Sequence, residues 1–132
     1  MSAAPHRRIT FNYNWNGKLF CNCFTTIRLR NDEKYRVGYE YDVILKGQNS
    51  GPAICCGIKH FKLAELNDFT AMIDTGYNKQ DCTAMLKTMY KNIVTNWETQ
   101  FLSIILLRRT IVDRSQAEPP KTIIYKAKPK AA

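Results

Sequence analysis

The segment 24–47 contains two runs in which the character of the side chains alternates, and this alternation constrains the fold more than any other feature. Small or apolar residues alternate with polar ones in 25–30, and large apolar residues occupy every second position in 39–45. Period-two patterns rich in β-branched and aromatic residues are typical of half-buried β-strands. Asn31–Lys34 and Gly38, which lie between the runs, favour a loop. We therefore predict two strands joined by a polar loop.

A third alternating run, 9–15, predicts an N-terminal strand, and Asn16-Gly17 after it is typical of a hairpin turn. A three-residue loop from Trp15 to Gly17 would place the apolar side chains of both hairpin strands on one face. The opposite face would then mix exposed aromatic rings with amides and basic groups, which suits stacking on bases and contact with phosphates. Its members would be Asn12, Asn14, Lys18, Phe20, Asn22, Phe24, Thr26, Arg28 and Arg30.

The second half of the chain predicts one strand, two helices and a returning strand. Residues 53–61 resemble a strand, and 63–75 carry apolar residues at helical spacing, with Gly76 placed to end that helix. Asn78 can cap a second helix whose apolar stripe is Cys82, Met85, Leu86, Met89, Tyr90 and Ile93. The run 101–107 is apolar on both faces, as expected of a central strand. Together these elements predict an α+β fold.

The length of 132 residues suits one domain, which we place at 9–112 between a flexible segment 1–8 and a basic C-terminal extension 113–132. No apolar run approaches the ~18 residues needed to cross a bilayer, so we expect no membrane association. The N-terminus has no apolar signal segment. Five cysteines in no disulfide-scaffold spacing are expected to be reduced and largely buried thiols of a cytoplasmic protein.

The net charge of +9 is unevenly distributed along the chain. Residues 1–38 and 108–132 each carry a net charge of +5, whereas 39–107 carries −1. If both ends meet in space they form one basic surface, which favours partners that bear phosphate groups. The alternative is a basic protein whose charge serves no dedicated partner.

The order of these parts resembles the ASCH domains of the PUA-like superfamily over roughly residues 19–109. The resemblance rests on TTIRLRN (25–31), YRVGYEYDVILKG (35–47), IKHFKLAELNDFTAMIDTGY (58–77) and FLSIILLRR (101–109). It implies a small mixed β-barrel of about five to six strands, with two helices packed beside a cleft. It also implies that the cleft binds RNA or nucleotides, and some members are similar to amidohydrolases of acetylated cytidine or to ribonucleases.

For the hydrolase members, the resemblance implies a Lys at the start of the Thr/Arg strand, a Thr three positions on and a Glu near the helices. If Arg30 matches the family's closing Arg, Thr25 occupies the Lys position and Arg28 the Thr position. Thr25 cannot replace a Lys that activates a nucleophile, so we favour a binding module over an enzyme. The candidate catalytic residues are Thr25, Thr26, Asp74 and His60.

The sequence therefore predicts a module that binds RNA or single-stranded nucleic acid in a basic cleft. Two alternatives stay open: a hydrolase of modified nucleosides or RNA, and a basic module that binds a protein partner. We expect no cofactor and no metal, because neither Cys21-x-Cys23 nor Cys55-Cys56 has the usual zinc spacing. The predicted nucleic-acid-binding residues are Lys18, Phe24, Thr26, Arg28, Arg30, Lys46, Lys59, Arg108 and Arg109.

Overall fold

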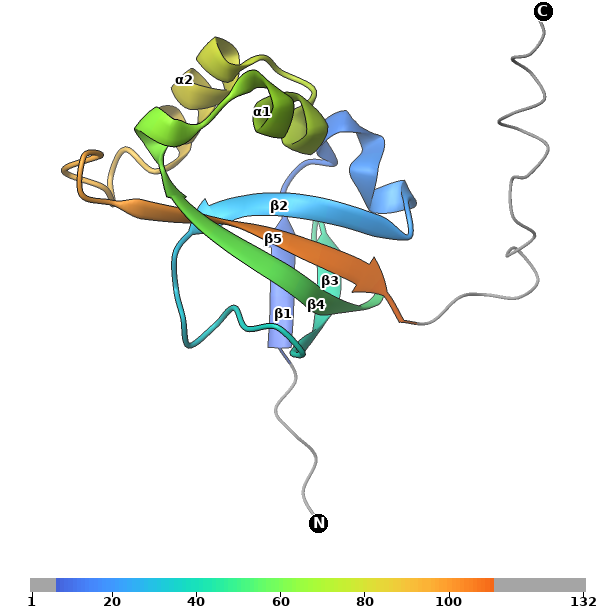
Figure 1. Ribbon diagram of the computed structural model, residues 1–132. Helices are drawn as coiled ribbons and strands as arrows, with labels where there is room; N and C mark the ends of the chain where they lie inside the picture. The colour runs from blue at the N-terminus through green and yellow to red at the C-terminus, as the bar shows by residue number, and fades with distance from the viewer. Residues whose placement is uncertain (1–6, 111–132) are drawn as a thin grey trace, which may run out of the picture.

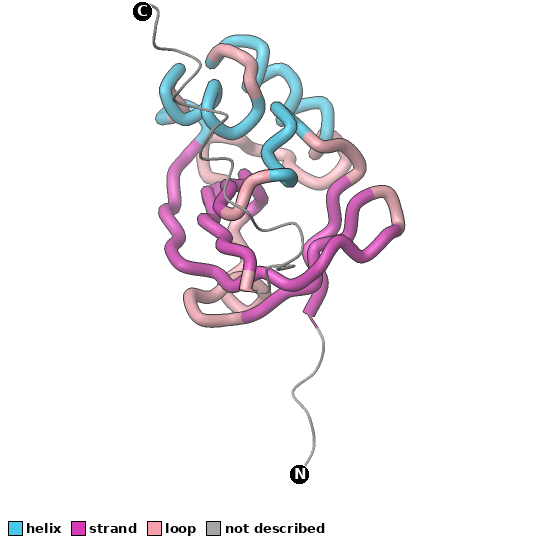
Figure 2. The backbone as a smooth tube through the Cα atoms, turned by 90° about the vertical axis from the view of Figure 1, so that its right-hand side faces the viewer, coloured by secondary structure: helices cyan, strands magenta, loops and turns pink. Residues whose placement is uncertain are grey.

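A strongly curled five-stranded sheet forms a half-barrel, and two helices lie over one end of it (Figures 1 and 2). The computed structural model describes residues 7–110. The strands are β1 (Arg7–Phe11), β2 (Cys23–Leu29), β3 (Glu40–Leu45), β4 (Gln48–Lys62) and β5 (Phe101–Arg109). The helices are α1 (Asp68–Thr75) and α2 (Lys79–Met89), with 3-10 helices η1 (Trp15–Phe20) and η2 (Leu63–Glu65). The predicted α+β class, with five strands and two helices, is confirmed.

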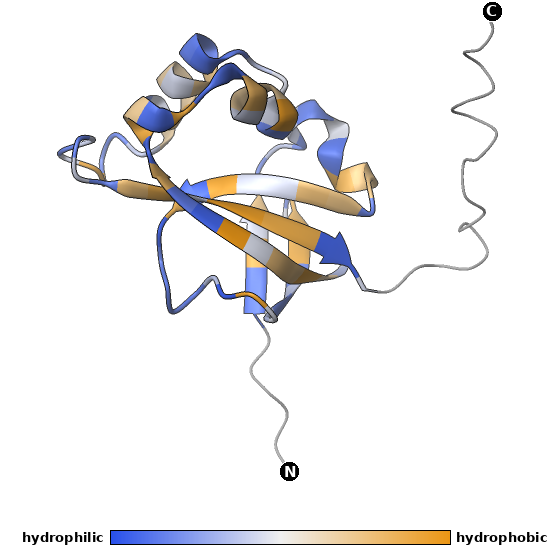
Figure 3. Cartoon of the chain, in the orientation of Figure 1, coloured by the Kyte–Doolittle hydropathy of each residue, from blue (hydrophilic) through white to orange (hydrophobic). Residues whose placement is uncertain are grey.

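The strand order in the sheet is β1-β3-β4-β5-β2, so β1 and β2 are its two edges. β1 and β3 are parallel, and the other neighbours are antiparallel. β5 pairs on one side with β2 and on the other with β4, which confirms the central strand expected from its apolar run. Figure 3 shows β5 hydrophobic along most of its length, with a hydrophilic end at Arg108 and Arg109.

The predicted N-terminal hairpin is wrong. The strand ends at Phe11, the turn residues Asn16 and Gly17 lie inside η1 with φ of 60° and 64°, and β1 pairs in parallel with β3. Asn-Gly does adopt the left-handed conformation, but pairing is decided by where the apolar side chains are buried. Ile9 and Phe11 pack in the same cluster as Tyr41 and Val43 of β3, which fixes β1 beside that strand.

Two hydrophobic clusters occupy the two faces of the curled sheet. The cluster inside the half-barrel consists of Ile9, Phe11, Leu19, Phe24, Tyr35, Tyr41, Val43, Ala53, Cys55, Ile105 and Leu107. The cluster under the helices consists of Ile27, Leu63, Leu66, Ala71, Cys82, Leu86 and Leu102. Alternate residues of β2 and β5 belong to different clusters, as period-two patterning requires.

The helix ends follow their sequence signals. Asn67 accepts a hydrogen bond from the Thr70 N–H and caps α1, so this helix begins five residues later than predicted. Gly76 ends α1 in the left-handed conformation with φ of 82°, and the Asn78 side chain caps α2. The apolar stripe of α2 is buried at Cys82 and Leu86, whereas its predicted members Met89 and Ile93 are exposed.

The predicted terminal segments are described only in part. Arg7 and Arg8, assigned by the sequence to a flexible N-terminus, are the first residues of β1. Residues 1–6 and the predicted extension 113–132 lie outside the described residues. Within 7–110, none of the helices has the length and apolar character needed to span a membrane.

Candidate functional site

A cavity of about 330 Å³ lies between the outer edge of β2, the segment that follows β1 and the two helices. Its wall combines charged, hydroxyl and aromatic side chains with a few apolar ones. The lining residues are Thr10, Phe11, Asn12, Tyr13, Trp15 and Lys18, then Thr26, Ile27 and Arg28 of β2, Asp74 and Thr75 of α1, and Met85, Leu86, Met89 and Tyr90. We call this space the cavity.

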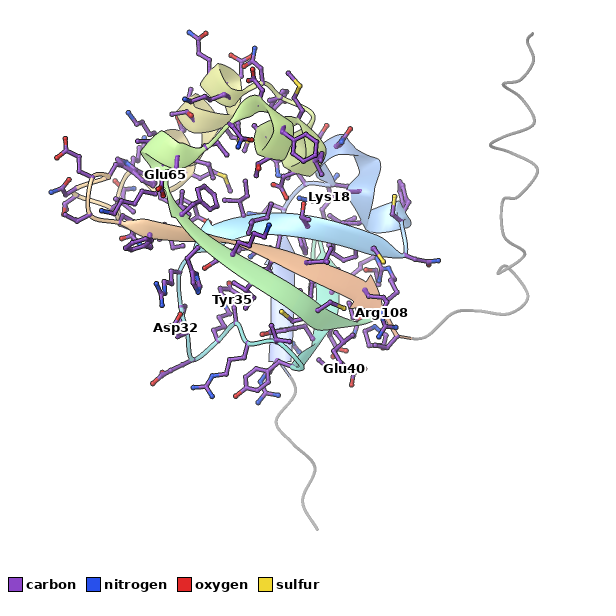
Figure 4. All side chains as sticks on the ribbon, in the orientation of Figure 1. Lys18, Asp32, Tyr35, Glu40, Glu65 and Arg108 are labelled. Atoms are coloured by element: carbon purple, nitrogen blue, oxygen red, sulfur yellow. The ribbon has the colours of Figure 1, made fainter. Side chains whose placement is uncertain are left out.

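A buried ion pair forms one side of the cavity. Lys18 Nζ lies 2.9 Å from Asp74 Oδ1, and both side chains are almost inaccessible to solvent. The Thr25 hydroxyl donates to the same carboxylate oxygen at 2.8 Å. Burial lowers the pKa of Lys18, and the charge of Asp74 opposes that change. Figure 4 shows Lys18 between β2 and the helices.

Arg28 bridges the two edge strands of the sheet. Its Nε donates to the Thr26 hydroxyl at 3.0 Å, and one terminal nitrogen donates to the Thr10 carbonyl at 2.6 Å. The guanidinium also lies 4.6 Å from the ring centre of Phe11. Arg28 therefore holds β1 against β2 where no backbone pairing joins them, and it orients Thr26.

Aromatic rings and one ammonium group line the opening of the cavity. Tyr13 is 53% exposed, and its ring contacts Trp15 edge-on at 4.7 Å. Trp15 in turn contacts Tyr77 at 5.6 Å, which fixes its orientation. Lys46 Nζ lies 6.0 Å from the Tyr13 ring centre. These rings were not among the predicted binding residues, because the sequence placed 9–15 in a regular hairpin strand.

The structure brings together only part of the predicted binding set. Lys18, Thr26 and Arg28 share the cavity, and Lys46 lies near its opening. Arg30 instead pairs with the exposed Asp32, and Lys59 lies on another surface.

Phe24 is a correction to the predicted binding face. Its side chain is 4% exposed and packs edge-on against Phe11 inside the half-barrel, so it cannot stack on a base in this structure. Phe20, which was placed on the same face, is 87% exposed in η1. The predicted face does not exist as one surface, because residues 15–20 form a short helix and not a strand.

The two arginines at the end of β5 differ in environment. Arg109 donates to the carbonyls of Ser50 and Leu19 at 2.9 and 2.6 Å, and burial lowers its pKa. It thus ties η1 and β4 to β5. Arg108 is exposed and lies at the far end of β5 from the helices (Figure 4).

The candidate catalytic residues are also divided. Thr25 and Asp74 are in direct contact, and Thr26 lies in the same cavity. His60 lies elsewhere, with Nδ1 2.8 Å from the Ser103 hydroxyl on the neighbouring strand. Lys18, which was predicted to bind nucleic acid, bonds to the same Asp74 carboxylate as Thr25. The sequence identified Asp74 as a candidate acid but gave no indication that Lys18 lies beside it.

The five cysteines are free thiols. Cys55 and Cys82 are buried as expected, whereas Cys21, Cys23 and Cys56 are exposed. Within residues 7–110, no group of three His, Cys, Asp or Glu side chains is arranged to hold a metal ion.

A second depression, which we call the groove, lies between α1 and the outer face of the sheet. Its volume is about 380 Å³, and its wall is mostly apolar. It is lined by Thr25, Gly57, Ile58, Lys59, Phe69, Thr70, Ile73, Ile104 and Leu106.

No family model matches the chain, and neither the curated proteins nor the solved structures contain a significant match. The resemblance to ASCH domains therefore stays a prediction from the sequence.

Proposed function

We propose that this domain binds RNA or single-stranded nucleic acid and takes one base into the cavity. The proposal is carried by one observation: the cavity combines the basic Lys18 and Arg28 with the aromatic Tyr13 and Trp15 at its opening. Aromatic faces stack on unpaired bases of any sequence, and basic groups attract the phosphate backbone.

The phosphates would be met by exposed ammonium groups, because the inner ones are engaged. Lys18 is paired with Asp74, and Arg28 donates to Thr26 and Thr10. Lys46 is exposed and lies beside Tyr13, so it is the basic group best placed to follow the backbone of a strand whose base enters the cavity. The net charge of +9 would favour the encounter.

Titration with a single-stranded RNA, a single-stranded DNA and a duplex over a salt series tests this proposal. Tyr13→Ala should weaken single-strand binding about tenfold, in line with the ~1–3 kcal/mol that base stacking contributes. Phe69→Ala is the matched control, because Phe69 is an exposed aromatic residue of the groove. Binding that is independent of salt, or equal for both variants, would contradict the proposal.

A second candidate, a hydrolase of modified nucleosides or RNA, is favoured by the contact between Lys18, Asp74 and Thr25. The Asp74 carboxylate accepts a hydrogen bond from the Thr25 hydroxyl and can take its proton, Lys18 can stabilise the negative charge that develops, and Thr26 lies in the same cavity. The sequence alone did not show that a lysine lies beside Asp74 and Thr25.

Turnover of acetylated cytidine and of RNA by the wild type and by Asp74→Asn tests this candidate. Activity that is lost in Asp74→Asn and kept in His60→Ala would support it, because His60 lies outside the cavity. The absence of turnover of both substrates would exclude it and leave the binding function.

A further inference from the structure

β2 pairs with β5 along one side only, so every second residue of β2 directs its backbone N–H and carbonyl groups away from β5, toward the outer edge of the sheet. At the two ends of this ladder, the Arg30 N–H donates to the Phe101 carbonyl and the Arg109 N–H donates to the Asn22 carbonyl, at 3.1 and 2.7 Å. The register between these ends has no bulge. Hydrogen-bonded pairs alternate with non-bonded pairs in an antiparallel ladder. The residues whose backbone groups point away from β5 are therefore Cys23, Thr25, Ile27 and Leu29.

Of these four residues, Ile27 lies at the wall of the cavity. Thr26, Ile27 and Arg28 all line the cavity although consecutive side chains of a strand alternate between its two faces, so the cavity lies along the edge of the β2 backbone at Ile27. Burial raises the pKa of Tyr90, which also lines the cavity, and the backbone of Leu29, the next residue along this edge, opposes that rise. Within residues 7–110, the ladder to β5 leaves the N–H and the carbonyl of Ile27 outside its hydrogen-bonded pairs, and no strand pairs with this edge of β2.

Backbone donors and acceptors in a protein interior are almost always paired, and an exception calls for a partner. We propose that the cavity's ligand hydrogen-bonds to both backbone groups of Ile27, with an acceptor set beside a donor on one flat edge. This is the pattern of a nucleobase edge, such as N3 and the amino group of cytosine or N1 and the amino group of adenine. The inference rests on the proposed function and specifies how the base is held.

Replacement of Ile27 by its α-hydroxy acid, introduced by nonsense suppression, removes the N–H and keeps the side chain. The ester variant should bind a single-stranded RNA of mixed sequence five- to tenfold more weakly than wild type, as expected for about one lost hydrogen bond. The same change at Cys23 is the matched control, because its N–H lies on the same edge of β2 but Cys23 is exposed and does not line the cavity. The control should bind as wild type does.

Failure of the proposed function and failure of the Ile27 backbone contact give different results in this experiment. If wild type binds no single-stranded nucleic acid, the proposed function fails. If wild type binds and the Ile27 ester binds equally well, the backbone contact is overturned and the proposed function stands.

A second measurement decides the matter if the ester variant does not fold. Wild type would be titrated with oligocytidine and oligoadenosine and with their 3-deaza and 1-deaza forms, which lack the ring acceptor. The base that binds better should lose about five- to tenfold in affinity on deaza substitution. Equal affinity of the normal and deaza forms would refute the contact.

Discussion

The cavity and the groove lie on two sides of α1, and their walls have opposite chemistry. Asp74 of this helix meets Lys18 in the cavity, whereas its neighbour Ile73 lines the groove. Adjacent residues of a helix point about 100° apart, so one short helix can supply a carboxylate to one site and an apolar side chain to the other. The comparison teaches that one short helix separates a site with a buried ion pair from a site with a mostly apolar wall.

The largest effect should follow removal of the cavity's carboxylate. Asp74→Leu leaves the ammonium group of Lys18 buried without its partner, which should lower the unfolding free energy by about 3–5 kcal/mol. Urea unfolding measures this loss. The double variant Lys18→Met/Asp74→Leu should recover most of it, because a matched apolar pair needs no counter-charge. A loss below about 1 kcal/mol in the single variant would mean that the pair is hydrated and open.

The neighbouring residue in the groove should matter much less. Ile73→Ala removes a side chain that is half-exposed, so the expected loss is about 1 kcal/mol, compared with about 2–5 kcal/mol for a fully buried Ile. The same urea experiment measures it. A loss as large as that of Asp74→Leu would show that the groove is covered in solution and belongs to the core.

Lys46 beside the cavity and Lys59 at the groove should differ in their effect on RNA binding. Lys46→Asn should lower RNA affinity about threefold and reduce the slope of log K against log salt by about 0.7, the value of one phosphate contact on a single strand. Asn is chosen because residue 46 has a positive φ of 51°, which Asn tolerates. Lys59→Asn at the groove is the control and should leave the slope unchanged. Equal changes in both variants would remove the distinction between the sites.

The smallest effect concerns pH. Burial under the helices raises the pKa of the Cys82 thiol above its ordinary value of 9.0. Above pH 9.0 the unfolded thiol loses its proton while the folded one retains it, so the native state binds more protons and the unfolding free energy falls as pH rises. Cys82→Ala should make that fall shallower in urea titrations between neutral and alkaline pH. Cys56→Ala, at an exposed thiol, should leave the slope as in wild type.

Local signals in the sequence were reliable where the chain interacts with itself over a few residues. The caps at Asn78 and Gly76 form as predicted because each depends on backbone conformation within one turn. The central position of β5 also followed from its composition, since a strand that is apolar on both faces must be covered on both.

The same local signals did not predict which segments, far apart in the sequence, lie next to each other. The alternation in 9–15 was consistent with a hairpin, but β1 pairs with β3 because Ile9 and Phe11 find the apolar side chains of that strand. Phe24 and Arg109 were predicted to contact nucleic acid on the basis of residue type. The structure buries Phe24 inside the half-barrel, and it engages the half-buried Arg109 with the carbonyls of Ser50 and Leu19.

The sequence by itself determined the α+β class, most of the strands, the two helices with their boundary at Gly76 and Asn78, and the excess of positive charge. Only the tertiary structure decided that Lys18 meets Asp74 across a separation of 56 residues, and that the edge of β2 faces the resulting cavity. The physical reason is that periodicity records which face of an element is buried. It does not record which distant element covers that face, and the site is made where two such faces meet.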